Sequence, residues 1–455
     1  MPQEGAAPHV LYVVWGFPPC RGGGVYRALA TANGFAAQGY RVTVLTASRE
    51  TFTRYTGADT SLEELVDPRI EVVRIPFAWP SQETDLREWG FFRTFAPRVW
   101  RRLRKRLDVV RFPEVGYGPW RTHLESAAQK IHEADPVDLV VASANPNVDF
   151  SAADHLHRTA GVPYVMDYRD AWTLDVFDGH QVHADGSRVA RLEARLVAGA
   201  REIWFVNEPI RAWHQRRYPE AAGRMHVVAN GYDPEFAPLP RATGRVPERP
   251  LRFGYIGTVS NKVPLAEFAA GWKLARRSPV MAEATAEIWG YLGFYSTPSP
   301  PLVQLIEQYA ETGLSYAGPL AKQRVREVYE TMDALLLILG SGLYVTSGKV
   351  FEYVASALPI VSVHDPRNAA SDILRGYPLW FPVSDLAPET IAHALEQAGE
   401  AARNATEELR AECRDFAVRY SRDLQLTPRI SALAHSLGFT PKGPPTTRPT
   451  TGAGS

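Results

Sequence analysis

The sequence has little cysteine, no long apolar run and no excess of charge of either sign. Its 455 residues include only Cys20 and Cys413, too few for a disulfide framework or a zinc-binding set, which suits a reducing compartment. No apolar run approaches the roughly 20 residues that span a bilayer, and the start, MPQEGAAPHV, lacks the basic and apolar stretches of a secretory signal. Fifty basic residues balance fifty acidic ones, which argues against nucleic acid as a partner. We therefore expect a soluble cytoplasmic protein.

What the sequence does have is an alternation of short apolar runs with helical patterns, which restarts after a proline-rich break at 233–250. Several runs, such as VLYVVW and VDLVVASA, are apolar on both faces, which is typical of parallel strands covered by helices on both sides. We predict an α/β protein with two Rossmann-like, doubly wound domains facing a cleft. The predicted boundaries are 1–240 for the first domain, 241–250 for a linker, 251–410 for the second domain, 411–438 for C-terminal helices that can cross back to the first domain, and 439–455 for a disordered tail.

A glycine cluster follows the first predicted strand. Gly22, Gly23 and Gly24 precede a predicted helix, so their backbone N–H groups can approach a phosphate closely, although a flexible turn would have the same composition. The dinucleotide fingerprint fits poorly, because Arg27 stands where its third glycine belongs. The second strand, RVTVLTA, also ends without the acid that would hold a ribose. These departures argue against a nicotinamide dehydrogenase.

The stretch SGLYVTSGKVFEYVASALPIVSV, from Ser341 to Val363, predicts a loop, a short helix and a strand. Thr346 and Ser347 are the expected N-cap residues, and Lys349 stands in a first turn that normally favours an acid. A diphosphate would satisfy the free N–H groups of Thr346–Gly348, the helix dipole and the lysine together. Glu352, one turn further in, is then placed for a ribose diol. The alternative is an exposed Lys–Glu pair worth about 0.3 kcal/mol.

A second glycine turn, GYIGTVSNKVP, contains Gly257 and Lys262, and this lysine is either a phosphate ligand or an ordinary surface residue. Taken together, these segments resemble a retaining glycosyltransferase of the two-Rossmann-domain (GT-B) type, close to glycosyltransferase family 4. GFPPCRGGGVYRA resembles that family's glycine-rich loop, VVANGYDPEF its NG-D--F segment with Asn230, and FGYIGTVSNK its donor-side phosphate loop. SGKVFEYVASALPIV resembles the segment with the second glutamate of E-x7-E, here Glu352. VMDYRDAW and FPEVGYGPW resemble a bacterial branch, and the likeness covers Val10 to Leu437.

The resemblance implies transfer of a sugar from a nucleotide diphosphate sugar to a hydroxyl acceptor, with retention at the anomeric carbon and without a metal or another cofactor. The acceptor would be a glycan, a lipid-linked precursor or a secondary metabolite. Residues expected to bind the donor are Gly22, Gly23, Gly24, Asn230, Gly257, Lys262, Thr346, Ser347, Gly348, Lys349 and Glu352, of which Lys349 and Glu352 also count as catalytic. The chain departs from the family pattern at Tyr344, where the first glutamate is expected, at Thr258, where an arginine is common, and at Ala357, where the family has glycine.

The end of a predicted first-domain strand carries Asp167, Arg169 and Asp170, which we expect to face the cleft. Asp170 is expected either to orient the acceptor hydroxyl or act as a catalytic base, or to form a local ion pair with the arginine that braces the loop. The segment DVFDGHQVHAD that follows contains His180, His183 and several acids, but without the helical spacing of a zinc site. We expect a loop near the acceptor there and no metal.

The stretch WGFFRTFAPRVWRRLRKRL, residues 89–107, combines aromatic side chains with a dense basic cluster. It fits either peripheral contact with an anionic membrane or a lipid acceptor, or a basic helix packed over the core along its arginine stems. Arginine outnumbers lysine by 43 to 7, as expected for a GC-rich bacterial genome, which weakens the meaning of any single arginine run.

Two other functions fit the same sequence. One is a pseudo-glycosyltransferase or a sugar-nucleotide epimerase on this fold, which product analysis would separate. The other is a catalytically silent nucleotide-sugar-binding protein, which Tyr344 at the first motif position keeps open.

Overall fold

The computed structural model describes residues 7–234, 249–260, 262–293, 299–320, 322–340 and 342–440. Most of the predicted linker (241–248) and of the predicted tail (441–455) lies outside these residues. The chain forms two compact units. Unit 1 comprises the chain up to Leu174, Gln181–Val228 and the part from Leu426 on, and unit 2 comprises Asp175–His180 and Ala229–Gln425.

Unit 1 is built on a seven-stranded parallel sheet with the order β3-β2-β1-β4-β5-β6-β7. The predicted apolar runs form its strands, and β1, β4 and β5 are buried along their whole length. The strands are β1 (His9–Val13), β2 (Arg41–Ala47), β3 (Glu71–Ile75), β4 (Leu139–Ala144), β5 (Tyr164–Tyr168), β6 (Glu202–Phe205) and β7 (Met225–Val227).

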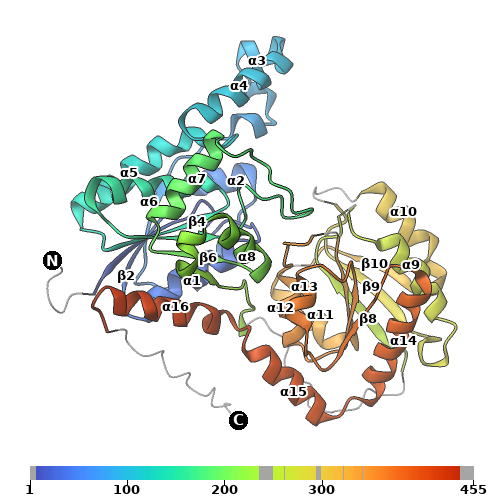
Figure 1. Cartoon of the computed structure of the whole chain (residues 1–455). Coiled ribbons are helices and arrows are strands. Elements are labelled where there is room, and N and C mark those ends of the chain that lie inside the picture. Colours follow the sequence, from blue (N-terminus) through green and yellow to red (C-terminus); the bar gives the residue numbers. More distant parts are fainter. Residues whose placement is uncertain are drawn as a thin grey trace, which may run out of the picture. The chain divides into compact units, whose positions relative to one another are not determined.

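Helices cover both faces of this sheet (Figure 1). The buried residues of α1 recur every three or four positions, and together with those of α16 they form one core with β1 and β2. The helices are α1 (Val25–Ala37), α2 (Arg49–Tyr55), α3 (Phe91–Phe95), α4 (Pro97–Arg111), α5 (Arg121–Ala134), α6 (Phe150–Ala160), α7 (Arg188–Gly199), α8 (Glu208–Arg217) and α16 (Arg422–Ser436). Helix α16 starts in unit 2 and enters unit 1 at Leu426.

Unit 2 is built on a six-stranded parallel sheet with the order β10-β9-β8-β11-β12-β13. The strands are β8 (Arg252–Ile256), β9 (Thr285–Trp289), β10 (Leu314–Gly318), β11 (Ala334–Ile338), β12 (Ile360–Val363) and β13 (Trp380–Pro382). The helices are α9 (Leu265–Ala275), α10 (Pro300–Gln308), α11 (Lys322–Thr331), α12 (Lys349–Ala355), α13 (Ala370–Leu374), α14 (Pro388–Asn404) and α15 (Glu407–Val418). The two Rossmann-like units confirm the predicted fold class.

Helix α12 is the short helix that the opening motif predicted, and its end is unusual. The helix stops at Ala355, and two residues later Ala357 has a φ of 54°, in the left-handed region that favours glycine. Ala357 is the only non-glycine residue with a positive φ among the described residues.

Within the described part of the chain, no helix is both long enough and apolar enough to cross a bilayer.

Candidate functional site

Two glycines at the carboxyl ends of neighbouring strands open a space in unit 2. Gly257 follows β8 with a φ of 138°, and a side chain there would overlap the Cε atom of Lys349. Gly290 follows β9 with a φ of 124°, and its own side chain would overlap the carbonyl oxygen of Gly257. Glycine at both positions therefore lets the Lys349 stem lie directly across the end of the sheet, where ligands of such folds bind.

The ammonium group of Lys349 is held by neutral partners. Its Nζ donates to Tyr255 Oη at 2.6 Å and lies 4.4 Å from the centre of the Tyr255 ring. A longer contact of 3.4 Å reaches the carbonyl oxygen of Thr258. Burial lowers the pKa of Lys349 to about 8, against an opposing effect of the Glu352 carboxylate. The lysine is thus a partly desolvated cation whose charge an incoming anion would stabilise.

The second motif residue, Glu352, lies one turn further along α12. It is half-buried, and it accepts a hydrogen bond of 3.0 Å from Oη of Tyr329, a buried residue of α11. The next residue, Tyr353, accepts a 3.0 Å hydrogen bond from the Ile256 N–H and so fastens α12 to the end of β8. Lys349 and Glu352 are therefore brought together on one helix whose position is fixed by tyrosines.

Sequence reasoning missed these tyrosines. Tyr255 stands two residues before Gly257 of the predicted glycine turn, and Tyr329 lies in a helix that precedes a strand, so neither was singled out by the sequence analysis. The available signal was that each tyrosine carries a hydroxyl among apolar neighbours. A buried tyrosine hydroxyl usually needs a hydrogen-bond partner.

The predicted capping of α12 is wrong. The N-cap residue is Gly348, and within the described part of the chain no side chain caps the helix. The turn closes instead through the carbonyl oxygens of Ser347 and Gly348, which accept from Val350 and Phe351 at 3.2 and 3.3 Å. Because Gly348 already has helical angles, the hydroxyls of Thr346 and Ser347 lie too far upstream to act as caps. Thr346 is buried, Ser347 is half-buried and Gly348 is exposed.

Lys262 has a different environment from Lys349. It is exposed, and its Nζ lies 4.1 Å from the centre of the Phe177 ring. It lines a pocket of about 620 Å³ in unit 2 together with Asp365 and Leu339, and neither Lys349 nor Glu352 belongs to that lining.

Tyr344, which replaces the first motif glutamate, packs on the segment Asp175–His180. Its N–H donates to the carbonyl oxygen of Val176 at 3.1 Å, and a side chain at Gly179 would lie 2.7 Å from its ring. The same segment brings together Asp175, Asp178 and His180. Asp175 accepts from two N–H groups of the segment, and Asp178 pairs with His180, so the acids brace the turn.

The NG-D--F segment connects to the start of α16. Gly231 has a φ of 62°, and a side chain there would lie 2.8 Å from the carbonyl oxygen of Tyr420. Asp233 pairs with Arg422 at 2.9 Å, and the half-buried Asn230 lies beside them in the chain. Phe236 falls outside the described residues. Through these contacts the chain that follows β7 packs against the start of α16. The donor-binding role of Asn230 stays a prediction.

In unit 1, an arginine side chain lies against the glycine cluster Gly22–Gly24. A side chain at Gly24 would overlap the guanidinium group of Arg169, which follows β5. Gly23 faces open space, and the N–H of Gly22 donates to Cys20 Sγ at 3.4 Å. A cation therefore lies at the start of α1, where an anion was predicted to bind.

The three charged residues after β5 have separate environments. Asp170 is exposed and pairs with Arg169 at 3.4 Å, so it is accessible to a substrate. The expectation that Asp167 faces a cleft is wrong. Asp167 is fully buried in the sheet, where it accepts three hydrogen bonds from Arg27, of 2.6, 3.0 and 3.1 Å, and one of 3.0 Å from Ser143.

Two buried carboxylates near β1 and β4 were not predicted. Asp149 accepts from the Trp15 N–H at 2.7 Å, and its other oxygen is buried without a hydrogen-bond partner among the described residues. Glu114 accepts from the N–H groups of Asn147 and Val148 at 2.9 and 2.7 Å. Burial raises the pKa of Glu114 to about 7 and raises that of Asp149 well above its usual value, with repulsion from Glu114 adding to the latter. The sequence signal for Asp149 was an acid shortly after a predicted strand, whereas Glu114 lies in the segment FPEVGYGPW, which follows no predicted strand.

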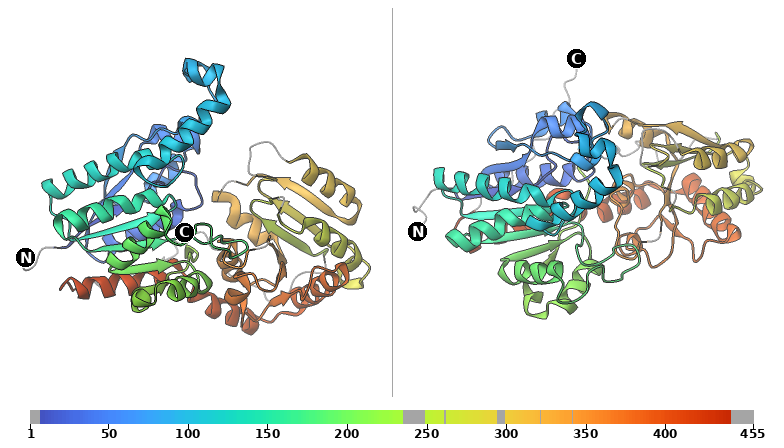
Figure 2. Two further views of the ribbon diagram at one scale, coloured as in Figure 1. Left: turned by 45° about the horizontal axis from the view of Figure 1, so that its top comes forward. Right: turned by 90° about the horizontal axis from the view of Figure 1, so that it is seen from above.

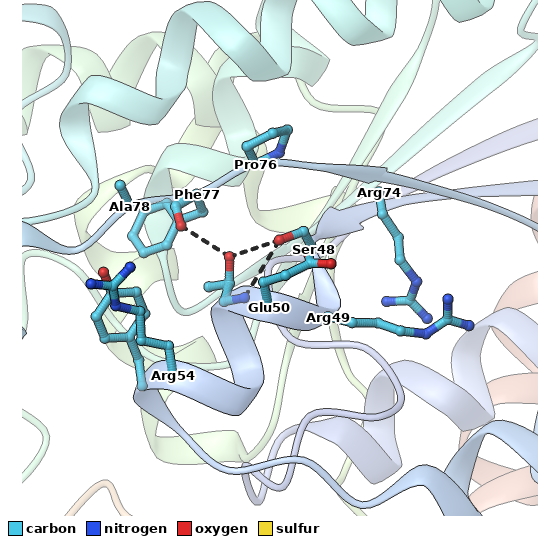
Figure 3. Close-up of a pocket in the computed structure, with 10 residues that line it drawn as sticks. Ser48, Arg49, Glu50, Arg54, Arg74, Pro76, Phe77 and Ala78 are labelled. Carbon is cyan, nitrogen blue, oxygen red and sulfur yellow. Dashed lines mark hydrogen bonds between the residues drawn. The ribbon is translucent and has the colours of Figure 1, made fainter.

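A pocket of about 530 Å³ opens beyond the carboxyl ends of β2 and β3 (Figure 3). Arg49 and Arg74 reach toward each other on one side, where Glu63 pairs with both at 2.8 and 3.1 Å. Arg54 lies on the other side beside Phe77. The pocket thus combines cationic side chains with an aromatic wall at the ligand-binding edge of the sheet.

Comparison with known proteins agrees with this architecture. Residues 22–231 match the family described as a glycosyl transferase 4-like domain, and no curated protein sequence matches the chain. Solved structures superpose over nearly the whole chain at low sequence identity. They include a glycosyltransferase from Rickettsia africae (11% identity, TM-score 0.63, covering 95% of this chain and 99% of that one) and the Anabaena protein HepE in complex with UDP (14%, 0.60, 94% and 100%). A candidate UDP-N-acetylglucosamine 2-epimerase from Listeria monocytogenes also superposes (9%, 0.56, 95% and 97%). At such identities these likenesses establish the shared GT-B fold.

Proposed function

Because residues 22–231 carry a glycosyl transferase 4-like domain within a chain of GT-B fold, we propose that this protein is a retaining glycosyltransferase. It would move a sugar from a nucleotide diphosphate sugar to a hydroxyl acceptor without a metal. The observation that carries the proposal is the placement of Lys349 and Glu352 at the glycine-lined end of the unit 2 sheet.

The donor-side chemistry needs charge stabilisation. As the bond from the anomeric carbon to the diphosphate breaks, its electron pair leaves with the phosphate oxygen, and negative charge builds there. The Lys349 ammonium, now held by a neutral tyrosine, would then pair with the phosphate. Glu352 would accept hydrogen bonds from the ribose hydroxyls, and Tyr329 would hold that carboxylate in place. The phosphates would occupy the space left by the small residue Gly257. They would accept hydrogen bonds from the N–H groups of Thr346, Ser347 and Gly348.

The acceptor-side chemistry needs a group to take the hydroxyl proton. Asp170 is exposed in unit 1 and can accept that proton while the new bond from oxygen to the anomeric carbon forms. The pocket of Arg49, Arg54 and Arg74 is our candidate for holding the acceptor. Roles for Gly22, Gly23, Gly24, Asn230 and Lys262 in donor binding stay predictions.

Two other functions share this fold. The superposition on a candidate UDP-N-acetylglucosamine 2-epimerase favours testing for epimerised nucleotide sugar. Tyr344 at the first motif position favours testing for nucleotide binding without turnover. Product analysis separates all three, because transfer releases free nucleotide and a glycosylated acceptor, epimerisation changes only the sugar, and a silent protein changes neither.

The first experiment is a thermal-shift series with UDP, GDP, ADP, CDP and dTDP, each with and without EDTA. The neighbour that contains UDP makes that nucleotide the first choice. Saturating ligand should raise the midpoint by about 2–5 °C, since only the folded state binds it. A rise that EDTA leaves unchanged supports a metal-independent diphosphate site. No shift with any nucleotide would speak against the proposal.

A further inference from the structure

Unit 1 carries a helical arm that does not pack over the core. The arm comprises α3 (Phe91–Phe95) and α4 (Pro97–Arg111), and it projects from the rest of unit 1 in Figure 1 and in the left view of Figure 2. This arrangement contradicts the alternative in which the basic helix 89–107 covers the core with its arginine stems. The arm belongs to unit 1, whereas Lys349 and Glu352 belong to unit 2.

The base of the arm is firmly anchored. Asp108, the buried acid of α4, accepts from the Gly116 N–H at 3.0 Å and pairs with Arg104 at 2.7 Å. Arg188 of α7 donates to the carbonyl oxygens of Val109 and Val110 at 2.6 and 2.7 Å. Hydrogen bonds therefore fix the base of the arm to the rest of unit 1.

The tip of the arm is also organised. The guanidinium group of Arg93 lies 3.9 Å from the ring centre of Trp89 and 4.6 Å from that of Trp100, and it donates to the carbonyl oxygen of Glu83 at 2.8 Å. This contact fixes α3 against the start of α4. It also leaves the phenylalanines of α3 pointing outward, with Phe91 and Phe95 78% and 73% exposed.

An apolar stripe continues along α4. Val99, Leu103, Leu107 and Val110 follow one another at spacings of four, four and three residues, which places them on one face of the helix. All four are exposed, Leu107 and Val110 to 63%. The arm thus presents a continuous set of large apolar side chains to solvent, which in a monomeric protein marks an interaction surface.

The charge of the arm differs from that of the chain. Residues 91–111 contain eight basic side chains and a single acid, Asp108, whereas the whole chain is neutral. Arg102 and Arg106 border one edge of the apolar stripe and Arg111 the other. A partner must therefore accept large apolar side chains and offer dense negative charge beside them. An anionic lipid surface has both properties, because its acyl boundary takes the apolar face while its phosphates take the arginines.

We propose that α3 and α4 dock this protein on the surface of an anionic bilayer. The apolar stripe enters the boundary between headgroups and acyl chains, and the flanking arginines pair with lipid phosphates. Helix α4, with 15 residues and dense positive charge, lies on the surface and does not cross it. A membrane-bound acceptor would then be presented to an enzyme held at the same surface.

Flotation of the whole protein with lipid vesicles tests the proposal. We expect the protein to float with vesicles of phosphatidylcholine containing about one third phosphatidylglycerol, and much less with phosphatidylcholine alone. Raising the salt from about 0.1 to 0.5 M should weaken binding, because it screens the arginines. The double variants Leu103→Ser/Leu107→Ser and Arg102→Glu/Arg106→Glu should each lower the bound fraction at least about tenfold.

Matched controls place equal changes on other surfaces. Leu424→Ser alters a similarly exposed leucine of α16, and Arg216→Glu/Arg277→Glu reverses two exposed charges outside the arm. Both controls should bind vesicles as the parent does. All variants change exposed residues, so their melting temperatures should match and exclude misfolding as the cause.

A second readout reports insertion directly. Because Cys20 and Cys413 are buried, a cysteine introduced at Phe95 offers a selective site for an environment-sensitive fluorophore. Its emission should shift to the blue on anionic vesicles, while the same label at Glu400 on α14 should not respond. Absence of flotation, or arm variants that bind as well as the parent, would overturn the proposal. A change from dimer to monomer in the arm variants without lipid binding would instead assign the surface to a second copy of the chain.

Discussion

At the scale of single residues, Lys349 makes ligand binding dependent on pH in a defined direction. Its pKa of about 8 lies below the usual value, so the free protein loses this proton as the pH rises through 8. A bound diphosphate should stabilise the charged form and raise the pKa again. Nucleotide affinity should therefore fall roughly tenfold between pH 7.5 and 9.5, with proton uptake on binding in that range.

Calorimetry in buffers of different ionisation enthalpy measures both effects. The variant Lys349→Met should bind weakly and show no pH dependence in that range. For the free protein the sign is opposite. The depressed pKa means that the unfolded chain holds the proton more tightly, so this group's contribution to stability rises between about pH 8 and 10.5. A pH-independent affinity in the parent protein would contradict the assignment of Lys349 to the diphosphate.

Glu352 gives a second test of the same site. Glu352→Ala should weaken nucleotide binding by about 1–3 kcal/mol, because a half-buried charged acceptor is lost from the ribose. The matched control is Glu400→Ala on the exposed face of α14, which should leave affinity unchanged. Titration calorimetry on the two variants decides whether Glu352 belongs to the site.

Ala357 stores strain that a single substitution relieves. Its φ of 54° places the Cβ atom against the backbone, whereas glycine adopts this angle freely. Ala357→Gly should raise the free energy of unfolding by about 0.5–1 kcal/mol, the gain being partly offset by the greater freedom of glycine in the unfolded chain. Glycine at Ala355, inside α12, should instead destabilise by about 1 kcal/mol. Urea unfolding of both variants checks the opposite signs.

At the scale of elements, a buried ion pair fixes α1 to β5. Asp167 and Arg27 are buried and joined by three hydrogen bonds, so removing one partner leaves a charge without compensation. Asp167→Asn should destabilise unit 1 by about 3 kcal/mol or more. The partly exposed pair Asp67–Arg69 provides the control, and Asp67→Asn should cost less than about 1 kcal/mol. Replacing both buried residues, as in Arg27→Met/Asp167→Leu, should restore part of the loss.

The elements themselves could be predicted because their cause is local. Runs such as VVASA are apolar on both faces, and that pattern alone indicates a covered parallel strand. Side-chain environments depend on contacts far apart in the chain. Asp167 looked like a site residue because it ends a strand, but its role follows from Arg27, 140 residues away. The predicted start of α12 was wrong by one or two residues. The N-cap is Gly348 and not Thr346 or Ser347, because Gly348 already has helical angles.

The candidate site was predicted in part. Lys349, Glu352 and Gly257 do come together, because a strand end and a helix start meet at the same sheet edge. Their tyrosine partners could not be predicted, since each comes from a different strand or helix. The buried carboxylates Asp149 and Glu114 were missed because only the packing around them raises their pKa values.

At the scale of the whole molecule, α16 completes the core of unit 1. Leu426, Ile430 and Leu433 pack with residues of α1 and β1, and Tyr40 donates to the carbonyl oxygen of Ile430 at 3.2 Å. A chain that ends at Gln425 should lose about 5 kcal/mol from unit 1, as expected for three large buried side chains. Calorimetry should show a lower transition temperature for unit 1, while the transition temperature of unit 2 stays unchanged. Two unchanged transitions would contradict this role of α16.

The position of α16 also sets the order of events during synthesis. The ribosome releases the strands of unit 1 first, up to Val228, but the helix that covers their core begins roughly 200 residues later. At about 5–20 residues per second, this side of the unit 1 core stays uncovered for roughly 10–40 seconds after Val228 has emerged. Unit 2 emerges in that interval and can fold at once. Unit 2 can therefore complete its fold before unit 1, although most of unit 1 is synthesised earlier. The nascent first half is thus a natural client for a chaperone until α16 has emerged.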